Sequence, residues 1–223
     1  MKAKRVNPAN WGTEIVNFES LPRQNHNDII LEVIEKSITL AYIVGVALGD
    51  GNLSCPNGRA VRLRISCDTK YPNIIKNIVT NLKNIFPNNK VSLCKHSSEH
   101  CIDVSVYSNK LNYIIPWTVG AGTKINQQAH VPTWIIENDQ FSISCLRGLL
   151  QTDGSIYADR GYIMVNFTNL IKPLINDVYQ MMSNLGFKPK IQSSLQKNGN
   201  VKYVVRLAKD VNHFIDKIEL TKT

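Results

Sequence analysis

Two acidic residues stand in nearly the same sequence context, 103 residues apart. Asp50 falls near the end of the stretch IVGVALGDG (43–51), and Asp153 near the end of LRGLLQTDG (146–154). Both apolar runs predict a helix, and a carboxylate at the negative end of a helix dipole is electrostatically unfavourable. A divalent cation offsets that repulsion, and oxygen ligands of this kind suit Mg²⁺. The doubled Asp-Gly therefore predicts one metal site shared by two helix ends.

Small residues recur one helical turn apart in both stretches. Gly45 and Gly49 are separated by four positions, as are Gly148 and Thr152. Because this spacing lets two helix backbones approach closely, we expect Gly45 and Gly148 at a helix–helix interface. The two aspartates then emerge side by side, where the main-chain carbonyls of Gly49 and Thr152 are candidate metal ligands.

The chain continues alike after the two aspartates, beginning with Gly51 and Gly154, which we expect in the left-handed conformation that ends many helices. Each half then reads as two strands, an amphipathic helix, a second hairpin and a final helix start. These segments are 52–70, 73–86, 90–107 and 108–115 in the first half, and 155–172, 173–187, 190–207 and 208–218 in the second. The predicted fold class is therefore α+β, a pseudo-two-fold pair of αββαββα units with antiparallel sheets.

Side-chain alternation indicates how the last strands of the two halves correspond. An offset of 99 residues places Val106 and Val205 on equivalent inward faces, whereas a shift of one residue reverses the faces. The same offset pairs Lys110 with Lys209, so we expect these two lysines to be equivalent.

The segment between the repeats is polar and contains glycine, which predicts a linker. It includes GAGTK (120–124), which resembles part of a phosphate-binding loop but lacks the spacing of one. The expected organisation is an N-terminal extension (1–36), a first half (37–118), a linker (119–140) and a second half (141–223).

The charge of the chain favours a polyanionic partner. The formal net charge is +9 and the pI about 9.3, which points to nucleic acid before a membrane surface. The longest apolar run, within 38–48, is far shorter than the ~20 residues of a membrane span. Five cysteines without a CxxC pair, and an N-terminus without an apolar signal, fit an intracellular protein without a membrane partner.

The stretches IVGVALGDG and LRGLLQTDG, the second preceded by VPTWI (131–135), resemble the two motifs of a LAGLIDADG homing endonuclease in its single-chain form. The order of elements is similar over about residues 37–218. Leu48 and Gln151 stand where the family name spells its earlier acidic residue, a position that is not the metal ligand. The resemblance implies two halves packed through their motif helices, with sheets that form a saddle over the DNA major groove.

The resemblance also implies an activity, the Mg²⁺-dependent double-strand cleavage of a long DNA target in intron homing. Asp50 and Asp153 are then the metal-binding, catalytic pair, and Mn²⁺ or Ca²⁺ are alternative occupants of the site. A basic residue that the family often has near the end of each last strand points to Lys110 and Lys209 as further catalytic residues. The two repeats in one chain imply a monomer.

Reading of a DNA sequence requires polar side chains on the strand faces opposite the helices. The candidates are Arg59, Arg62, Arg64, Ser66, Tyr107, Tyr162, Asn166, Thr168, Lys190, Gln192, Lys202 and Arg206. Because these side chains differ between the halves, the expected target is asymmetric double-stranded DNA.

Two alternatives on the same scaffold remain open at this point, an RNA maturase that assists splicing of intron RNA and a DNA-binding protein without catalysis. A zinc site at Cys94, His96, His100 and Cys101 is less favoured, because neighbouring residues of a strand point to opposite faces.

Overall fold

A computed structural model describes residues 35–95 and 100–222. The first half holds one four-stranded sheet and three helices. Its elements are α1 (Ile38–Asp50), β1 (Gly51–Ser54), β2 (Arg62–Asp68), α2 (Pro72–Ile85), β3 (Val91–Lys95), β4 (Cys101–Tyr107) and α3 (Leu111–Ile114).

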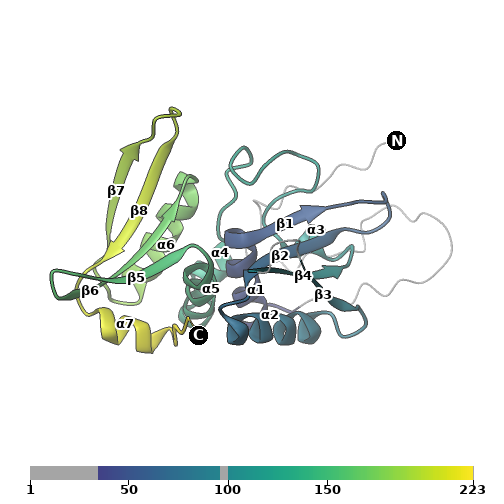
Figure 1. Ribbon diagram of the computed structural model, residues 1–223, viewed down its shortest axis with the longest axis horizontal. Coiled ribbons are helices and arrows are strands. Elements are labelled where there is room, and N and C mark those ends of the chain that lie inside the picture. The colour runs from purple at the N-terminus through teal and green to yellow at the C-terminus, as the bar shows by residue number, and fades with distance from the viewer. Residues whose placement is uncertain (1–34, 96–99, 223) are drawn as a thin grey trace.

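The second half repeats this order after one short helix, α4 (Thr133–Ile136). Its elements are α5 (Asp139–Thr152), β5 (Gly154–Asp159), β6 (Tyr162–Asn169), α6 (Lys172–Asn184), β7 (Lys190–Leu195), β8 (Val201–Leu207) and α7 (Val211–Lys217). The observed architecture is the predicted pair of αββαββα units, and Figure 1 shows a sheet on either side of the central α1 and α5.

Both sheets are antiparallel and have the same strand order, β1-β2-β4-β3 and β5-β6-β8-β7. Alternate residues of the central strands are buried against the helices, among them Ile65 and Val104 in the first sheet and Phe167 and Val205 in the second. The residues between them form the opposite, polar face of each sheet. Each half therefore presents one polar sheet face that its helices do not cover.

The central helices begin at side-chain caps. Ser37 Oγ accepts a hydrogen bond from the Leu40 backbone N–H at 3.1 Å, and Asn138 Oδ1 accepts one from Gln140 at 2.9 Å. Residues 40–48 of α1 are buried on all sides, which explains why the sequence there has no polar face.

Close contact between α1 and α5 depends on glycine. A Cβ on Gly148 would lie 2.5 Å from the Tyr42 carbonyl oxygen, and one on Gly45 would overlap the Cys145 backbone. Polar groups also cross the interface, since Tyr42 Oη donates to Gln151 Oε1 at 2.7 Å. The two motif helices thus meet at the glycines singled out in the sequence.

The structure corrects the expected offset of the last strands. Ile65 pairs with Val104 and Phe167 with Val205, while Gly51 and Gly154 occupy the matching positions on β1 and β5. Val104 of β4 therefore corresponds to Val205 of β8, so the last strands of the two halves are offset by 101 residues and not by 99. Inward and outward faces were predicted correctly, because alternation fixes parity but cannot detect a shift of two residues.

A second correction concerns the glycines after the aspartates. Gly51 has φ −78° and ψ 148°, and neither it nor Gly154 has a positive φ. A Cβ on Gly51 would lie 2.5 Å from the Ala47 carbonyl oxygen. Glycine fits here because the chain turns tightly against the end of its own helix, not because it adopts the left-handed conformation.

Two further expectations concern the N-terminal extension and a membrane-spanning helix. Nearly all of the proposed N-terminal extension, together with His96, lies outside the described residues. Within 35–95 and 100–222, no helix has the length and apolar character needed to cross a bilayer.

Candidate metal and nucleic-acid site

The aspartates of the two motifs lie close together at the ends of α1 and α5. Burial, and after it the negative charge of Asp153, raise the pKa of Asp50 to about 6. Burial likewise raises the pKa of Asp153. Asp50 nevertheless keeps an exposed surface and Asp153 a partly exposed one, so both carboxylates are accessible from outside. A pair of neighbouring carboxylates with a disfavoured charge is an arrangement that a bound cation stabilises.

The two carboxylates have different neighbours. Asn169 Nδ2 donates to Asp153 Oδ2 at 3.0 Å, and its Oδ1 accepts from the backbone N–H groups of Leu170 and Ile171. This amide is therefore fixed by the start of α6 and in turn orients Asp153. In the first sheet the equivalent position is Cys67, whose pKa burial and the charge of Asp50 raise to about 12.

A lysine of the linker occupies the end of α1. Lys124 Nζ donates to the carbonyl oxygens of Ala47 at 3.2 Å and Leu48 at 2.8 Å, and also to that of Gly49. Its ammonium group lies 5.3 Å from the centre of the Trp117 ring. Desolvation lowers the pKa of Lys124, while the charges of both motif aspartates act in the opposite direction.

The second motif has a similar neighbour in the C-terminal tail. Lys222 Nζ donates to the Gly154 carbonyl oxygen, and desolvation lowers its pKa against the charges of the two aspartates. The tail is held to α5 by Arg147, whose Nε donates to the Ile218 carbonyl oxygen at 2.7 Å and whose Nη2 lies 2.6 Å from Glu219. One lysine ammonium group therefore lies at the end of each motif helix, Lys124 at α1 and Lys222 just after α5.

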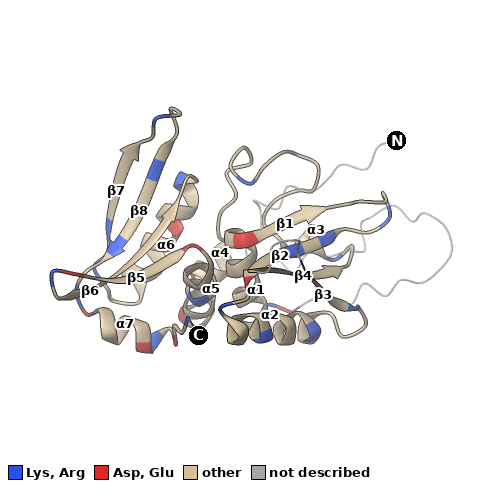
Figure 2. Ribbon diagram, in the orientation of Figure 1, with Lys and Arg blue, Asp and Glu red and all other residues tan. Residues whose placement is uncertain are grey.

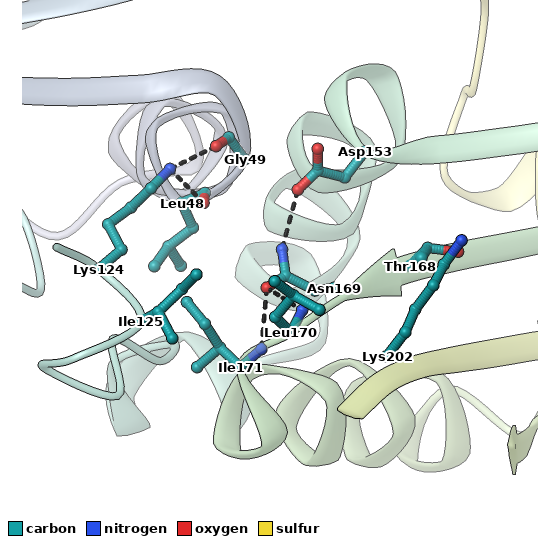
Figure 3. A pocket seen from close by; sticks show the side chains of 10 residues that line it. All are labelled: Leu48, Gly49, Lys124, Ile125, Asp153, Thr168, Asn169, Leu170, Ile171 and Lys202. Atoms are coloured by element: carbon teal, nitrogen blue, oxygen red, sulfur yellow. Dashed lines mark hydrogen bonds between the residues drawn. The ribbon is translucent and has the colours of Figure 1, made fainter. Parts of the chain in front are cut away.

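A pocket of about 330 Å³ opens beside Asp153 (Figure 3). Its polar lining includes Lys124, Asn169, Thr168 and Lys202, and its apolar lining comes from Leu48, Ile125, Leu170 and Ile171. A positively charged pocket next to an acidic pair is suited to an anionic group that approaches the metal site.

The lysines predicted from the sequence lie elsewhere. Lys110 is the N-cap residue of α3, and Lys209 precedes α7. Lys110 follows β4, whose last residue, Tyr107, lies in the same row as Ser54. Ser54 is at the end of β1 that is remote from Asp50. The lysines whose charges act on both aspartates are Lys124, in the predicted linker, and Lys222, near the end of the second half. The catalytic role of Lys110 and Lys209 stays a prediction.

The predicted DNA-contact residues fall on the polar faces of the two sheets, with the exception of Arg59 in the turn between β1 and β2. Figure 2 shows basic residues on β2 and β8 among them. The side chains that hold these residues could not be identified from the sequence pattern. Asp103 contacts Arg64 and Ser66, and Tyr157 contacts Arg206.

The donor set of the site fits a hard divalent cation. Across 35–95 and 100–222, no group of three or more His, Cys, Asp or Glu side chains is positioned to hold a metal ion. Two carboxylates alone suit Mg²⁺, which usually keeps several water ligands and also binds substrate phosphate. The Gly49 carbonyl accepts a hydrogen bond from Lys124, and the Thr152 hydroxyl donates back into its own helix. Metal ligation by the main-chain carbonyls of Gly49 and Thr152 stays a prediction.

Comparison with known proteins agrees with this geometry. Residues 140–219 match the family described as LAGLIDADG-like domain. A crystal structure of I-DmoI in complex with DNA and Mn has a TM-score of 0.59 at 22% identity, over 83% of this chain and 98% of that one. The N-terminal LAGLIDADG domain of DUF199/WhiA has a TM-score of 0.55 at 13% identity, over 83% and 84%. A search of curated protein sequences gives no match.

The element order and the paired central helices are those of the LAGLIDADG fold, with two αββαββα units in one chain. Residues 140–219 match the LAGLIDADG-like domain, and the chain as a whole has the fold of I-DmoI, which is described as a homing endonuclease. Since that fold is also found in DUF199/WhiA, the fold alone does not establish an activity.

Proposed function

We propose that this protein is a site-specific endonuclease that hydrolyses double-stranded DNA with a divalent cation, Mg²⁺ in the first place. The observation that supports this most strongly is the approach of Asp50 and Asp153, one from each half, at the centre of two polar sheet faces. A protein that only binds DNA has no need for two neighbouring carboxylates whose ionisation burial disfavours. The complex of I-DmoI with DNA and Mn adds support from the same fold.

In this proposal Asp50 and Asp153 hold the cation from opposite sides of the helix pair, and Asn169 orients Asp153. The cation, when bound, lowers the pKa of water and stabilises negative charge on the phosphate. Lys124 and Lys222 add positive charge close to the same point and stabilise the extra charge of the transition state. The pocket beside Asp153 accommodates a DNA phosphate between Lys124 and Lys202.

In this proposal the polar faces of the two sheets bind a long DNA target. Their polar faces flank the aspartates on both sides, and different side chains occupy matching positions, so the proposed target is asymmetric and the protein acts as a monomer. Lys and Arg contacts to phosphates provide most of the affinity, and base contacts on the strands provide selectivity.

The proposal is tested by cleavage of a DNA library with randomised inserts in Mg²⁺, followed by sequencing of the new ends. We expect the full chain to cut a restricted set of sequences, and Asp50→Asn and Asp153→Asn to lose at least about 10³-fold in rate while DNA binding is retained. Asp216→Asn, on α7, is the matched control. Binding by the wild type without any cutting identifies a DNA-binding protein on this scaffold and contradicts the proposal.

A further inference from the structure

The guanidinium of Arg206 is held in place on the polar face of the second sheet. Its Nη2 donates to Tyr157 Oη at 2.9 Å, and its Nε donates to Asn166 Oδ1 at 3.3 Å. Asn166 Nδ2 also donates to Tyr157 Oη at 3.0 Å, which closes a ring of three side chains from three strands. Two of the five N–H donors of Arg206 are therefore engaged, and the outer end of the fork keeps donors on both Nη groups.

Arg64 is held on the first sheet by a different residue. Its Nη1 lies 3.7 Å from Asp103 Oδ2, and Ser66 Oγ donates to Asp103 Oδ1 at 2.7 Å. Asp103 is only 6% exposed, and a buried carboxylate is unfavourable unless it is paired. The Nε of Arg64 is buried, so its accessible donors are again on the Nη groups.

The register places these arginines in equivalent rows of the two sheets. Arg64 stands opposite Asn52 and Ser105, and Arg206 stands in the row of Asn166 and Ser155. Each row is the first outward-facing row after the motif aspartate, since Gly51 and Gly154 belong to inward-facing rows. The two guanidinium groups thus lie in matching rows on either side of the aspartate pair, although on different strands: Arg64 is on β2, and Arg206 is on β8, which corresponds to β4.

We propose that Arg64 and Arg206 each read one guanine in the major groove, one in each half of the target, and that Asp103 and Tyr157 are their positioning residues. Guanine presents two acceptors, O6 and N7, which a guanidinium fork contacts as a pair. A fixed fork is not required for a phosphate contact, because a lysine can bind a phosphate as a point charge. This inference rests on the proposed DNA-binding function and specifies its base selectivity.

The test is selection of randomised duplex DNA by the full chain in EDTA, so that cleavage does not compete with binding. We expect one guanine to be fixed in each half of the enriched wild-type sequence. Arg206→Lys keeps the charge but should reduce the preference for guanine by about tenfold in one half only, and Arg64→Lys in the other half only. Tyr157→Phe should weaken the same guanine as Arg206→Lys, with the other positions unchanged.

Tyr179→Phe on α6 is the matched control for Tyr157→Phe, and melting curves check that each variant is folded. Lysine variants that keep every base preference, with or without a change in total affinity, overturn the inference and indicate phosphate contacts. Enrichment of no sequence overturns it too. Cleavage of the selected duplex in Mg²⁺ is scored separately: a protein that reads both guanines but does not cut contradicts only the nuclease, and one that cuts without guanine preference contradicts only this inference.

Discussion

Asp50 and Asp153 are the same residue type in repeated motifs, yet their surroundings differ. Asn169 donates a hydrogen bond to Asp153 and favours its ionised form, whereas the equivalent position beside Asp50 is a cysteine, Cys67. Burial and the charge of Asp153 raise the pKa of Asp50 to about 6. Asp50 is therefore the residue whose protonation sets the acid limit for cation binding in the proposed site.

Asp50→Asn should stabilise the protein in EDTA. The folded state keeps its proton up to about pH 6, while the unfolded chain releases it near pH 4. Between these values the folded state binds more protons, so wild-type stability falls as the pH rises, and the full penalty is present above pH 6. We expect Asp50→Asn to melt ~1–3 °C higher at pH 7.5 and like the wild type at pH 3.5. A variant that melts lower at pH 7.5 contradicts this.

Lys124→Met should separate cation binding from catalysis. The ammonium group repels a divalent cation and donates to the Gly49 carbonyl, a candidate ligand. Its loss should increase Mg²⁺ affinity at pH 8 by about fivefold, measured by calorimetry, and should slow DNA cleavage. Because Lys124 lowers the pKa of Asp50, the half-point of Mg²⁺ binding should move to higher pH. Lys83→Met, on α2, is the control and should change neither; parallel losses of affinity and rate would indicate a merely structural role.

At the level of elements, the contact between α1 and α5 positions the site. Gly45→Ala should destabilise the protein by about 2–3 kcal/mol in urea unfolding, because its Cβ would overlap the Cys145 backbone in a close-packed interface. Gly58→Ala is the control, since its Cβ would meet nothing within 4 Å and the positive φ of +65° alone costs roughly 1–2 kcal/mol. An equal effect of the two substitutions would show that the helix contact is not tight.

These elements also show how far the sequence could predict the structure. The repeated motifs, the helix contact at Gly45 and Gly148, and the polar strand faces all follow from local patterns that the fold preserves. The neighbours of the helix ends do not, because Lys124 arrives from an irregular linker and Lys222 from a tail. The sequence GAGTK reveals a charged residue in a predicted linker. Its position at the end of α1 depends on the tertiary path of the chain, which the local pattern does not determine.

At the scale of the whole molecule, one sheet lies on either side of the central α1 and α5 (Figure 1), and each sheet has a polar face. Binding of a long duplex by these faces should depend strongly on salt. Neutralisation of about six to ten phosphates gives a slope of roughly −5 to −9 for log K against log salt, measured by fluorescence anisotropy.

Arg59→Ala should reduce the magnitude of that slope by about 1, because the turn between β1 and β2 would lose one phosphate contact. Lys83→Ala is the control on the helix side of the first sheet. A slope near zero, or one that only the control changes, contradicts binding through the sheet faces.

Anomalous diffraction from crystals soaked in Mn²⁺ tests whether Asp50 and Asp153 jointly bind one or more divalent cations. We expect a manganese peak within bonding distance of both carboxylates, and its loss in Asp50→Asn crystals. Crystals at a pH above 6 in which manganese binds elsewhere, or in which the carboxylates point apart with no peak between them, would contradict it.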